Sequence, residues 1–203
     1  VVTTCGDGAT SKGDFYESIN LAGAMGLPVV FVVNNNRWAI SVPLKKQTAA
    51  KTIAHKSLAA GITGYRVDGN DPIAVYHVVN QALDLARNKH QPSIIEALTY
   101  RLCDHTTADD ASRYRPQQEL DEARKLEPLI RFKTFLKNDH GWSSKEDEAL
   151  YAQCTKQVKK SIKVYQSYPD QPDGEFFDYM FAQPTADLEK QKQEWLAEVK
   201  HHG

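Results

Sequence analysis

The chain has 203 residues, of which 41% are hydrophobic, 25% charged and 9% aromatic. These ordinary proportions exclude disordered and fibrous proteins. Its 25 basic and 26 acidic residues give a net charge of −1, which argues against a nucleic-acid-binding protein because such proteins usually carry a basic surface. The longest apolar run, Leu27–Val33, contains a proline and is too short to span a bilayer.

The three cysteines lie far apart and show no CxxC pattern. This argues against a disulfide framework or a zinc ribbon and favours a reducing compartment. The chain starts Val1-Val2-Thr3-Thr4-Cys5, without a methionine or a signal-peptide pattern. These β-branched residues are typical of a strand, so we expect the chain to be the C-terminal part of a longer protein.

The first half of the chain alternates between predicted strands and predicted helices. The apolar run 29–33 lies between Pro28 and Asn34 and is typical of a strand buried on both faces of a parallel sheet. Asp71-Pro72 opens the clearest helix, because Asp is a favoured N-cap and Pro a favoured first residue. The other predicted strands are 1–5, 65–67 and 93–100. Two more helices are predicted: one that Asp14 caps and Gly26 ends, and one over about 49–60 that Gly61 ends. This alternation predicts an α/β fold, with a mostly parallel sheet and helices on both faces.

The character of the sequence changes after Tyr100. The polar stretch 101–116 is longer than most loops in compact domains, which indicates a functional or mobile segment. Helices are predicted at 128–137, from a cap at Ser144, and at 185–200. An apolar cluster at 176–181 is expected to dock on the body of the protein or on a partner. We therefore divide the chain into an α/β domain, 1–116, which includes the loop 101–116, and a helical extension, 117–203.

The segment Gly6–Ile40 places polar side chains at two strand ends. Asp7 follows the first strand and Asn34–Asn36 follow the second, and in an open parallel sheet ligands bind beyond the carboxyl ends of the strands. A carboxylate and an amide oxygen suit an Mg²⁺ ion that holds a phosphate, while Gly6 and Gly8 allow the backbone to approach the phosphate closely. An isolated Gly-Asp-Gly is usually only a tight turn, but two strand-end motifs in this arrangement favour a site.

The spacing of these motifs carries a family resemblance. With 26 residues between Gly8 and Asn35-Asn36, the pattern GDG-x26-NN resembles the thiamine-diphosphate motif. The whole chain resembles the alpha subunit of the thiamine-diphosphate-dependent decarboxylating component of 2-oxo acid dehydrogenase complexes, in particular the bacterial pyruvate type. The resemblance continues through NNRWAIS, YRVDGNDPIAVY and EALTYRLCDHTTADDASRYR, and into the helical tail after EPLIRF. It implies the thiamine-diphosphate-binding fold with a helical C-terminal extension and, in the full subunit, a substantial segment before the GDG strand.

The resemblance implies a role for each matched residue around Mg²⁺ and thiamine diphosphate. The side chains of Asp7 and Asn36 match the metal ligands. Trp38, where the family usually has Tyr, matches the residue whose backbone carbonyl binds the metal. Because this ligand is a backbone atom, the substitution leaves it in place. The remaining implied cofactor contacts are Gly6, Gly8 and Ala9 along the diphosphate, Ile40 against the cofactor, and His105.

His105 is the implied catalytic residue, since it matches the loop histidine near the reactive end of the cofactor. Its implied roles are hydrogen bonding to the bound phosphate or intermediate and acid/base help in acyl transfer. Without the resemblance, a lone histidine in a polar loop is usually only solvated.

Thr106 stands where animal relatives carry a regulatory phosphoserine, and an unregulated enzyme is the preferred interpretation. Asp109-Asp110 and Arg113–Arg115 either order the loop by salt bridges or form a solvated charged turn.

The implied reaction is oxidative decarboxylation of pyruvate, with reductive acetylation of a lipoyl group on the acyltransferase core. Branched-chain 2-oxo acids are the alternative substrates.

The implied partner is a beta subunit, in an assembly of two alpha and two beta subunits. The resemblance implies neither a nucleic-acid partner nor a membrane. Because that subunit supplies the glutamate that activates the cofactor, we expect this chain alone to be inactive. The implied location is the cytoplasm of a bacterium, or the mitochondrial matrix of a eukaryote. An alternative of another class is a non-catalytic βαβ module that binds a nucleotide or acts as a scaffold.

Overall fold

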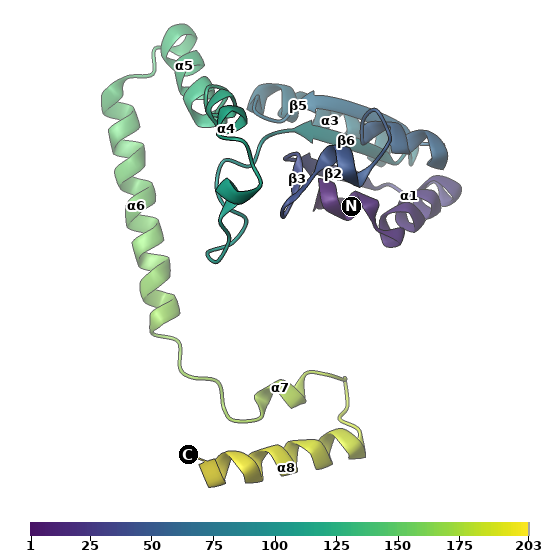
Figure 1. Ribbon diagram of the computed structural model, residues 1–203, viewed down its shortest axis with the longest axis vertical. Helices are drawn as coiled ribbons and strands as arrows, with labels where there is room; N and C mark the ends of the chain where they lie inside the picture. The colour runs from purple at the N-terminus through teal and green to yellow at the C-terminus, as the bar shows by residue number, and fades with distance from the viewer. Residues whose placement is uncertain (203) are drawn as a thin grey trace. The chain divides into compact units, whose positions relative to one another are not determined.

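The computed structural model describes residues 1–202, and side chains as far as residue 199. The chain forms two compact units, Val1–Trp142 and a second one that begins at Ser143. The first unit contains the sheet, and the second is helical (Figure 1). The division into a binding domain, 1–116, and an extension, 117–203, stays a prediction.

Four parallel strands form the sheet of the first unit, in the order β1-β2-β6-β5. Their bounds are β1 Val2–Gly6, β2 Val30–Asn35, β5 Thr63–Asp68 and β6 Ser93–Leu98. The register pairs Gly6 with Asn34 and Asn35 with Leu98, so the carboxyl ends of the strands lie level at one edge. The predicted α/β class with a mostly parallel sheet is confirmed.

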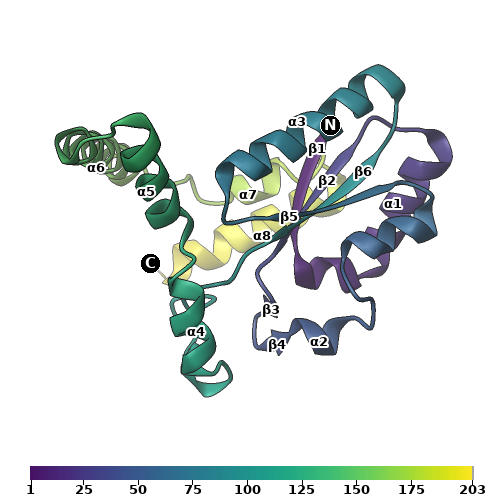
Figure 2. The same ribbon diagram turned by 90° about the horizontal axis from the view of Figure 1, so that it is seen from above.

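One helix covers each face of this sheet: α1 (Gly13–Met25) and α3 (Pro72–Lys89) lie on opposite sides (Figure 2). Successive side chains of a strand point to opposite faces, so the apolar run of β2 serves both. Phe31 and Val33 pack with α1 in one core cluster, whereas Val30 packs with α3 in the other. The fully apolar run in the sequence therefore reflects burial on both faces.

Helix ends agree with the sequence in part. Asp71 caps α3, since its carboxylate accepts hydrogen bonds from the backbone N–H groups of Ile73 and Ala74. Gly26 ends α1 in the left-handed conformation, with φ of 58°. The predicted cap at Asp14 is wrong, because Asp14 lies within the first turn and Lys12 precedes the helix.

The helix predicted over 49–60 is wrong in its start and type: a 3₁₀ helix, η2 (Ala54–Ala60), forms in this range and ends at Gly61 with φ of 65°. A separate short helix, α2 (Leu44–Gln47), precedes the range. The backbone N–H of Ala54 donates to the Glu96 carboxylate on β6. A contact from a distant strand therefore satisfies a group that a continuous helix would bond internally.

Short elements follow the strand ends. After β1 comes a 3₁₀ helix, η1 (Asp7–Ser11), and after β2 an antiparallel hairpin of β3 (Trp38–Ala39) and β4 (Val42–Pro43), which the sequence did not predict. The rest of the first unit comprises η3 (Ala111–Arg113), α4 (Gln117–Arg124) and α5 (Pro128–His140).

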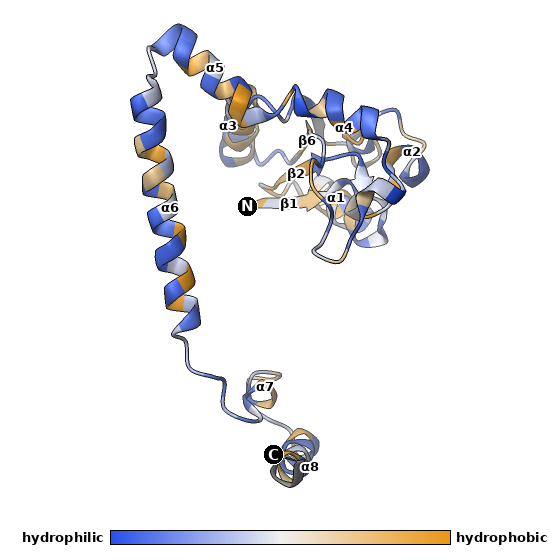
Figure 3. Cartoon of the chain, turned by 60° about the vertical axis from the view of Figure 1, so that its left-hand side comes forward, coloured by the Kyte–Doolittle hydropathy of each residue, from blue (hydrophilic) through white to orange (hydrophobic). Residues whose placement is uncertain are grey.

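The second unit contains α6 (Ser144–Gln166), α7 (Glu175–Asp178) and α8 (Ala186–His202). Ser143, one residue before the predicted Ser144, forms a capping box with Glu146. The rings of Phe176 and Trp195 meet edge to face, with centroids 5.0 Å apart, so part of the apolar cluster at 176–181 docks on α8. Hydrophobic and hydrophilic residues are interspersed along α6 (Figure 3). Among the described helices, none combines the length and the apolar character that crossing a bilayer requires.

Candidate functional site

The register of the sheet brings Asp7 and the three asparagines to the same edge. Gly6 pairs with Asn34, so Asp7, the next residue, leaves β1 beside the point where β2 continues into Asn35 and Asn36. The side chain of Asp7 is buried, with 1% exposed. Two of the sequence-predicted metal ligands therefore lie on neighbouring strand ends, as the βαβ pattern indicated.

Side-chain hydrogen bonds shape the turn after β2. Oδ1 of Asn35 accepts from the backbone N–H of Arg37 at 3.1 Å, and Oδ1 of Asn36 accepts from that of Trp38 at 3.1 Å. Arg37 between them has φ of 70°. An amide oxygen has two lone pairs, so Asn36 keeps one for a ligand while its orientation is fixed by the other.

Trp38 is held through both its side chain and its backbone carbonyl. Its indole N–H donates to the Tyr100 hydroxyl at 3.2 Å, and the centroid of its ring lies 5.5 Å from that of Tyr114. Its carbonyl oxygen accepts from Nη1 of Arg101 at 3.4 Å. This long hydrogen bond uses one lone pair of the carbonyl and leaves the second for the predicted metal contact.

The Gly-Asp-Gly turn has a packing reason for one of its glycines. A Cβ atom on Gly8 would lie 2.6 Å from Cβ of Ala39, whereas one on Gly6 would meet no atom within 4 Å. Gly8 is therefore required by the close approach of η1 to β3. Gly6 and Ala9 are exposed, which leaves the backbone of this turn accessible to a ligand.

Ile40 stands out in the hairpin because its φ is 53° and its side chain is 57% exposed. A β-branched residue rarely adopts a positive φ, and such strain persists only where surrounding contacts impose it. Nη2 of Arg101 donates to the Ile40 carbonyl at 3.0 Å. The hairpin thus presents an apolar side chain in a strained, held conformation at the predicted cofactor position.

The loop 101–116 is organised by two arginines. Nη1 of Arg115 donates to the carbonyl of Arg101 at 2.5 Å and to that of Cys103 at 3.2 Å. Oδ2 of Asp109 accepts from the backbone N–H of His105 at 2.8 Å and from the Tyr114 hydroxyl. The hydrogen bond from Tyr114 is the largest of the effects that lower the pKa of Asp109.

The same loop carries His105 on an exposed stretch. Since Arg101 also bonds the carbonyls of Trp38 and Ile40, the base of the loop is fixed to the hairpin at the candidate site. The loop is therefore ordered by guanidinium-to-carbonyl hydrogen bonds together with hydrogen bonds to its carboxylates.

A buried lysine that the sequence did not single out supports η1. Nζ of Lys56 donates to the carbonyl of Thr10 at 2.6 Å and to its hydroxyl at 3.1 Å, and lies 4.9 Å from the centre of the Tyr16 ring. Lys56 is 5% exposed. Burial and then the negative charge of Asp7 raise the pKa of the nearby Cys5 thiol, while Lys56 acts in the opposite direction.

Gln47 was also missed, because nothing in Lys-Lys-Gln-Thr distinguishes it from a surface residue. Its Nε2 donates to Oδ2 of Asp7 at 2.8 Å and to the Val42 carbonyl at 3.0 Å. Its Oε1 is buried and has no hydrogen-bond partner. Glu96, which binds Asn35, did carry a signal, namely a carboxylate inside the apolar strand SIIEAL.

The donors at this edge are carboxylate, amide and backbone carbonyl oxygens, the hard ligands that Mg²⁺ prefers. They fit a magnesium-bound diphosphate, and the unpartnered oxygen of Gln47 beside Asp7 agrees with a missing polar group. Among the described residues there is no cluster of three or more His, Cys, Asp or Glu placed to hold a metal. A magnesium site here would thus depend on amide and carbonyl ligands besides Asp7.

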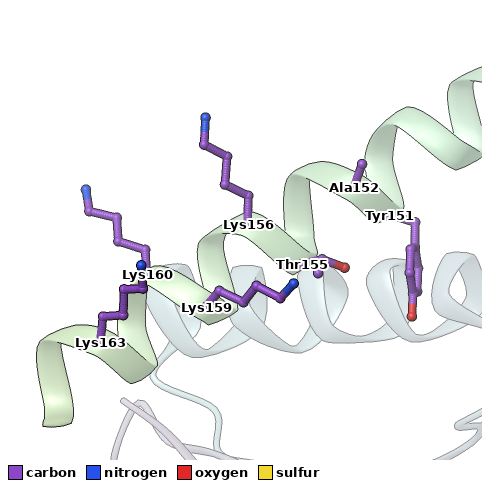
Figure 4. A pocket seen from close by; sticks show the side chains of 7 residues that line it. All are labelled: Tyr151, Ala152, Thr155, Lys156, Lys159, Lys160 and Lys163. Carbon is purple, nitrogen blue, oxygen red and sulfur yellow. The ribbon is translucent and has the colours of Figure 1, made fainter.

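A separate surface hollow lies on α6 and is lined by that helix alone (Figure 4). Its lining includes the four lysines Lys156, Lys159, Lys160 and Lys163. None of the sequence-predicted site residues belongs to it, so it is unrelated to the sheet edge described above.

Comparison with known proteins gives a consistent result. A family model described as the dehydrogenase E1 component matches residues 1–173. The chain is 44% identical over 200 residues to the 3-methyl-2-oxobutanoate dehydrogenase subunit alpha of Mycobacterium tuberculosis. The matched region covers 98% of this chain and 54% of that relative. The chain is 44% identical over 191 residues to the pyruvate dehydrogenase E1 component subunit alpha of Bacillus subtilis, covering 94% and 52%. The chain therefore spans about half the length of the curated relatives it matches.

Proposed function

Because the chain belongs to the dehydrogenase E1 component family, we propose that it forms the Mg²⁺- and diphosphate-binding half of an alpha subunit. The enzyme oxidatively decarboxylates pyruvate and transfers the acetyl group to a lipoyl group. When bound, thiamine diphosphate supplies the electron sink for the decarboxylation. The observation that carries the proposal is the placement of Asp7 and Asn36 on neighbouring parallel strand ends, in a chain of this family.

The residues of the sheet edge bind and orient the cofactor. Asp7, Asn36 and the carbonyl of Trp38 hold Mg²⁺. Gly6, Gly8 and Ala9 line the diphosphate, and Ile40 lies against the cofactor. The support for this assignment is the oxygen donor set, the accessible backbone of η1 and the held conformation of the hairpin.

His105 acts at the reactive end, where it holds or moves a proton during acyl transfer. The support is its place on an exposed loop whose base is fixed to the Trp38–Ile40 hairpin by Arg101. Arg115 and Asp109 position the loop and take no part in the chemistry.

We infer the partners from the same family membership. A beta subunit supplies the glutamate that activates the cofactor, in an assembly of two alpha and two beta subunits. The lipoyl-bearing acyltransferase core receives the acyl group. We place this assembly in the bacterial cytoplasm. Two bacterial relatives of equal identity carry the names of a pyruvate dehydrogenase and of a 3-methyl-2-oxobutanoate dehydrogenase, so a branched-chain 2-oxo acid is the second candidate substrate.

Cofactor binding tests the proposal directly. The full-length protein, purified with its beta subunit, is titrated with thiamine diphosphate in the presence of Mg²⁺ and in the presence of a chelator. We expect thiamine diphosphate to bind only with Mg²⁺. For Asp7→Asn we expect its affinity to fall at least about 100-fold, because losing a metal ligand should cost more than losing an outer-shell partner, which typically costs about 10- to 100-fold. Asp14→Asn, a change of the same type at an exposed position of α1, is the matched control.

Absence of Mg²⁺-dependent binding in the wild type would favour a non-catalytic βαβ module. Steady-state turnover with pyruvate and with 3-methyl-2-oxobutanoate then distinguishes the two substrates. A higher kcat/KM for the branched-chain acid would overturn the choice of pyruvate.

A further inference from the structure

Gln47 occupies a position beside the proposed metal ligand that no motif explains. It is the last residue of α2, and its Nε2 donates to Oδ2 of Asp7 at 2.8 Å and to the carbonyl of Val42 at 3.0 Å. A carboxylate that is 1% exposed has few partners available. The amide of Gln47 therefore holds one of the two oxygens of Asp7 in place.

The orientation of this amide is set by its surroundings. An ionised carboxylate and a backbone carbonyl are both hydrogen-bond acceptors only, so the NH₂ group of Gln47 must face them. Its oxygen then points the other way. In this orientation Oε1 lies 3.8 Å from the point where a Cβ atom on Gly8 would be, beside η1.

This oxygen is an exception to the usual satisfaction of buried polar atoms. It is buried without any hydrogen-bond partner, whereas the large majority of buried polar side-chain atoms in proteins have one. It lies on the amide that holds Asp7, next to the turn proposed to line the diphosphate. Such an atom indicates a donor that arrives with a ligand.

The chemistry of Mg²⁺ supplies such a donor. Mg²⁺ requires near-octahedral geometry and usually keeps bound water molecules, whose hydrogen atoms need acceptors. We propose that Gln47 is a positioning residue for the magnesium ion, an inference that rests on the proposed function. Its Nε2 fixes the rotamer of Asp7, and its Oε1 accepts a hydrogen bond from a water molecule on the ion.

The test uses the full-length protein with its beta subunit. Mg²⁺ is titrated calorimetrically at saturating thiamine diphosphate for the wild type, Gln47→Met and Gln47→Leu. Removing an outer-shell partner typically weakens metal binding 10- to 100-fold. We expect the Kd for Mg²⁺ to rise by at least about tenfold in both variants, while the Kd for thiamine diphosphate at saturating Mg²⁺ changes by less than about threefold. Lys46→Met, on an exposed residue of the same helix, is expected to leave both constants unchanged.

The melting temperature of the metal-free protein separates positioning from folding. We expect it to stay within a few degrees of the wild type in at least one variant. A Kd for Mg²⁺ within twofold of the wild type in both variants overturns the inference, as does failure of both variants to fold, which would make Gln47 a structural residue. If the wild type itself does not bind Mg²⁺ with thiamine diphosphate, the proposed function fails instead.

Discussion

The side-chain amide of Asn35 donates a hydrogen bond of 2.7 Å to Oε1 of Glu96 on the neighbouring strand, and both residues are 1% exposed. Oε2 of the same carboxylate accepts from the backbone N–H of Ala54 at 3.1 Å and lies 3.7 Å from Nε of Arg66. Glu96 therefore fixes the start of the asparagine turn and the start of η2. The geometry at the sheet edge depends on a carboxylate that lies inside the sheet.

Replacing Glu96 by Leu should destabilise the protein strongly. The substitution leaves the buried Asn35 amide and the Ala54 N–H without acceptors, and each such group costs about 1–3 kcal/mol. We expect the free energy of unfolding to fall by about 3 kcal/mol in urea titrations at fixed protein concentration. Glu96→Gln, which keeps one acceptor oxygen, should lose less. Equal stability of the wild type and Glu96→Leu would contradict this account.

Replacing Lys56 by Met should loosen η1. The ammonium group is buried and holds both the carbonyl and the hydroxyl of Thr10, and a hydrogen bond to a charged group contributes about 1.5–3 kcal/mol. We expect a loss of about 2 kcal/mol in the free energy of unfolding and faster amide hydrogen exchange within Asp7–Ser11. Lys12→Met, on an exposed residue, serves as the control. Unchanged exchange in this segment would show that Lys56 does not support it.

The Cys5 thiol should react slowly with alkylating reagents at neutral pH. Burial, followed by the charge of Asp7, raises the pKa of this thiol, and only the thiolate is nucleophilic. Peptide mapping by mass spectrometry should show iodoacetamide modifying the exposed Cys103 and Cys154 first. The rate at Cys5 should still be rising with pH above about 8.5, the ordinary thiol pKa.

The sign of the Asp7 contribution can be checked separately. Because a neighbouring negative charge disfavours the thiolate, Asp7→Asn should lower the pKa of Cys5. The pH profile of alkylation at Cys5 should then shift to lower pH, with those of Cys103 and Cys154 unchanged. A shift to higher pH would contradict the proximity of the two side chains.

His105 should matter more for acyl transfer than for cofactor binding. General acid–base catalysis contributes about 10²–10⁴-fold, so we expect His105→Asn to slow reductive acetylation of a lipoyl domain at least about 100-fold. The Kd for thiamine diphosphate should change much less than this rate, since His105 is one of several cofactor contacts and not a metal ligand. His77→Asn, at an exposed position of α3, is the matched control. Wild-type acetylation rates in His105→Asn would remove this residue from the chemistry.

The sequence by itself determined the features that depend on neighbouring residues. The run 29–33 predicted a strand buried on both faces, and Asp71-Pro72 predicted the start of α3. The parallel α/β class followed from the alternation of such elements. Asp7 and the cluster Asn34–Asn36 could be singled out because the carboxyl ends of parallel strands share one edge, whereas the choice of Asn36 within that cluster came from the family resemblance.

Only the tertiary structure decided which groups support that edge. Gln47 holds Asp7 across 40 residues, Lys56 holds Thr10 across 46, and Glu96 binds Asn35 across 61. The same long-range contacts explain why the 3₁₀ helix η2, beginning at Ala54, forms in place of a helix over 49–60, since the N–H of Ala54 is taken by Glu96. The local sequence pattern shows which residues of a single helix or strand are buried. A hydrogen bond between distant residues depends instead on how the helices and strands pack together. Gln47 and Lys56, which have no special local context, and Glu96, which its apolar strand marks without naming a partner, thus acquire their partners only when the sheet assembles.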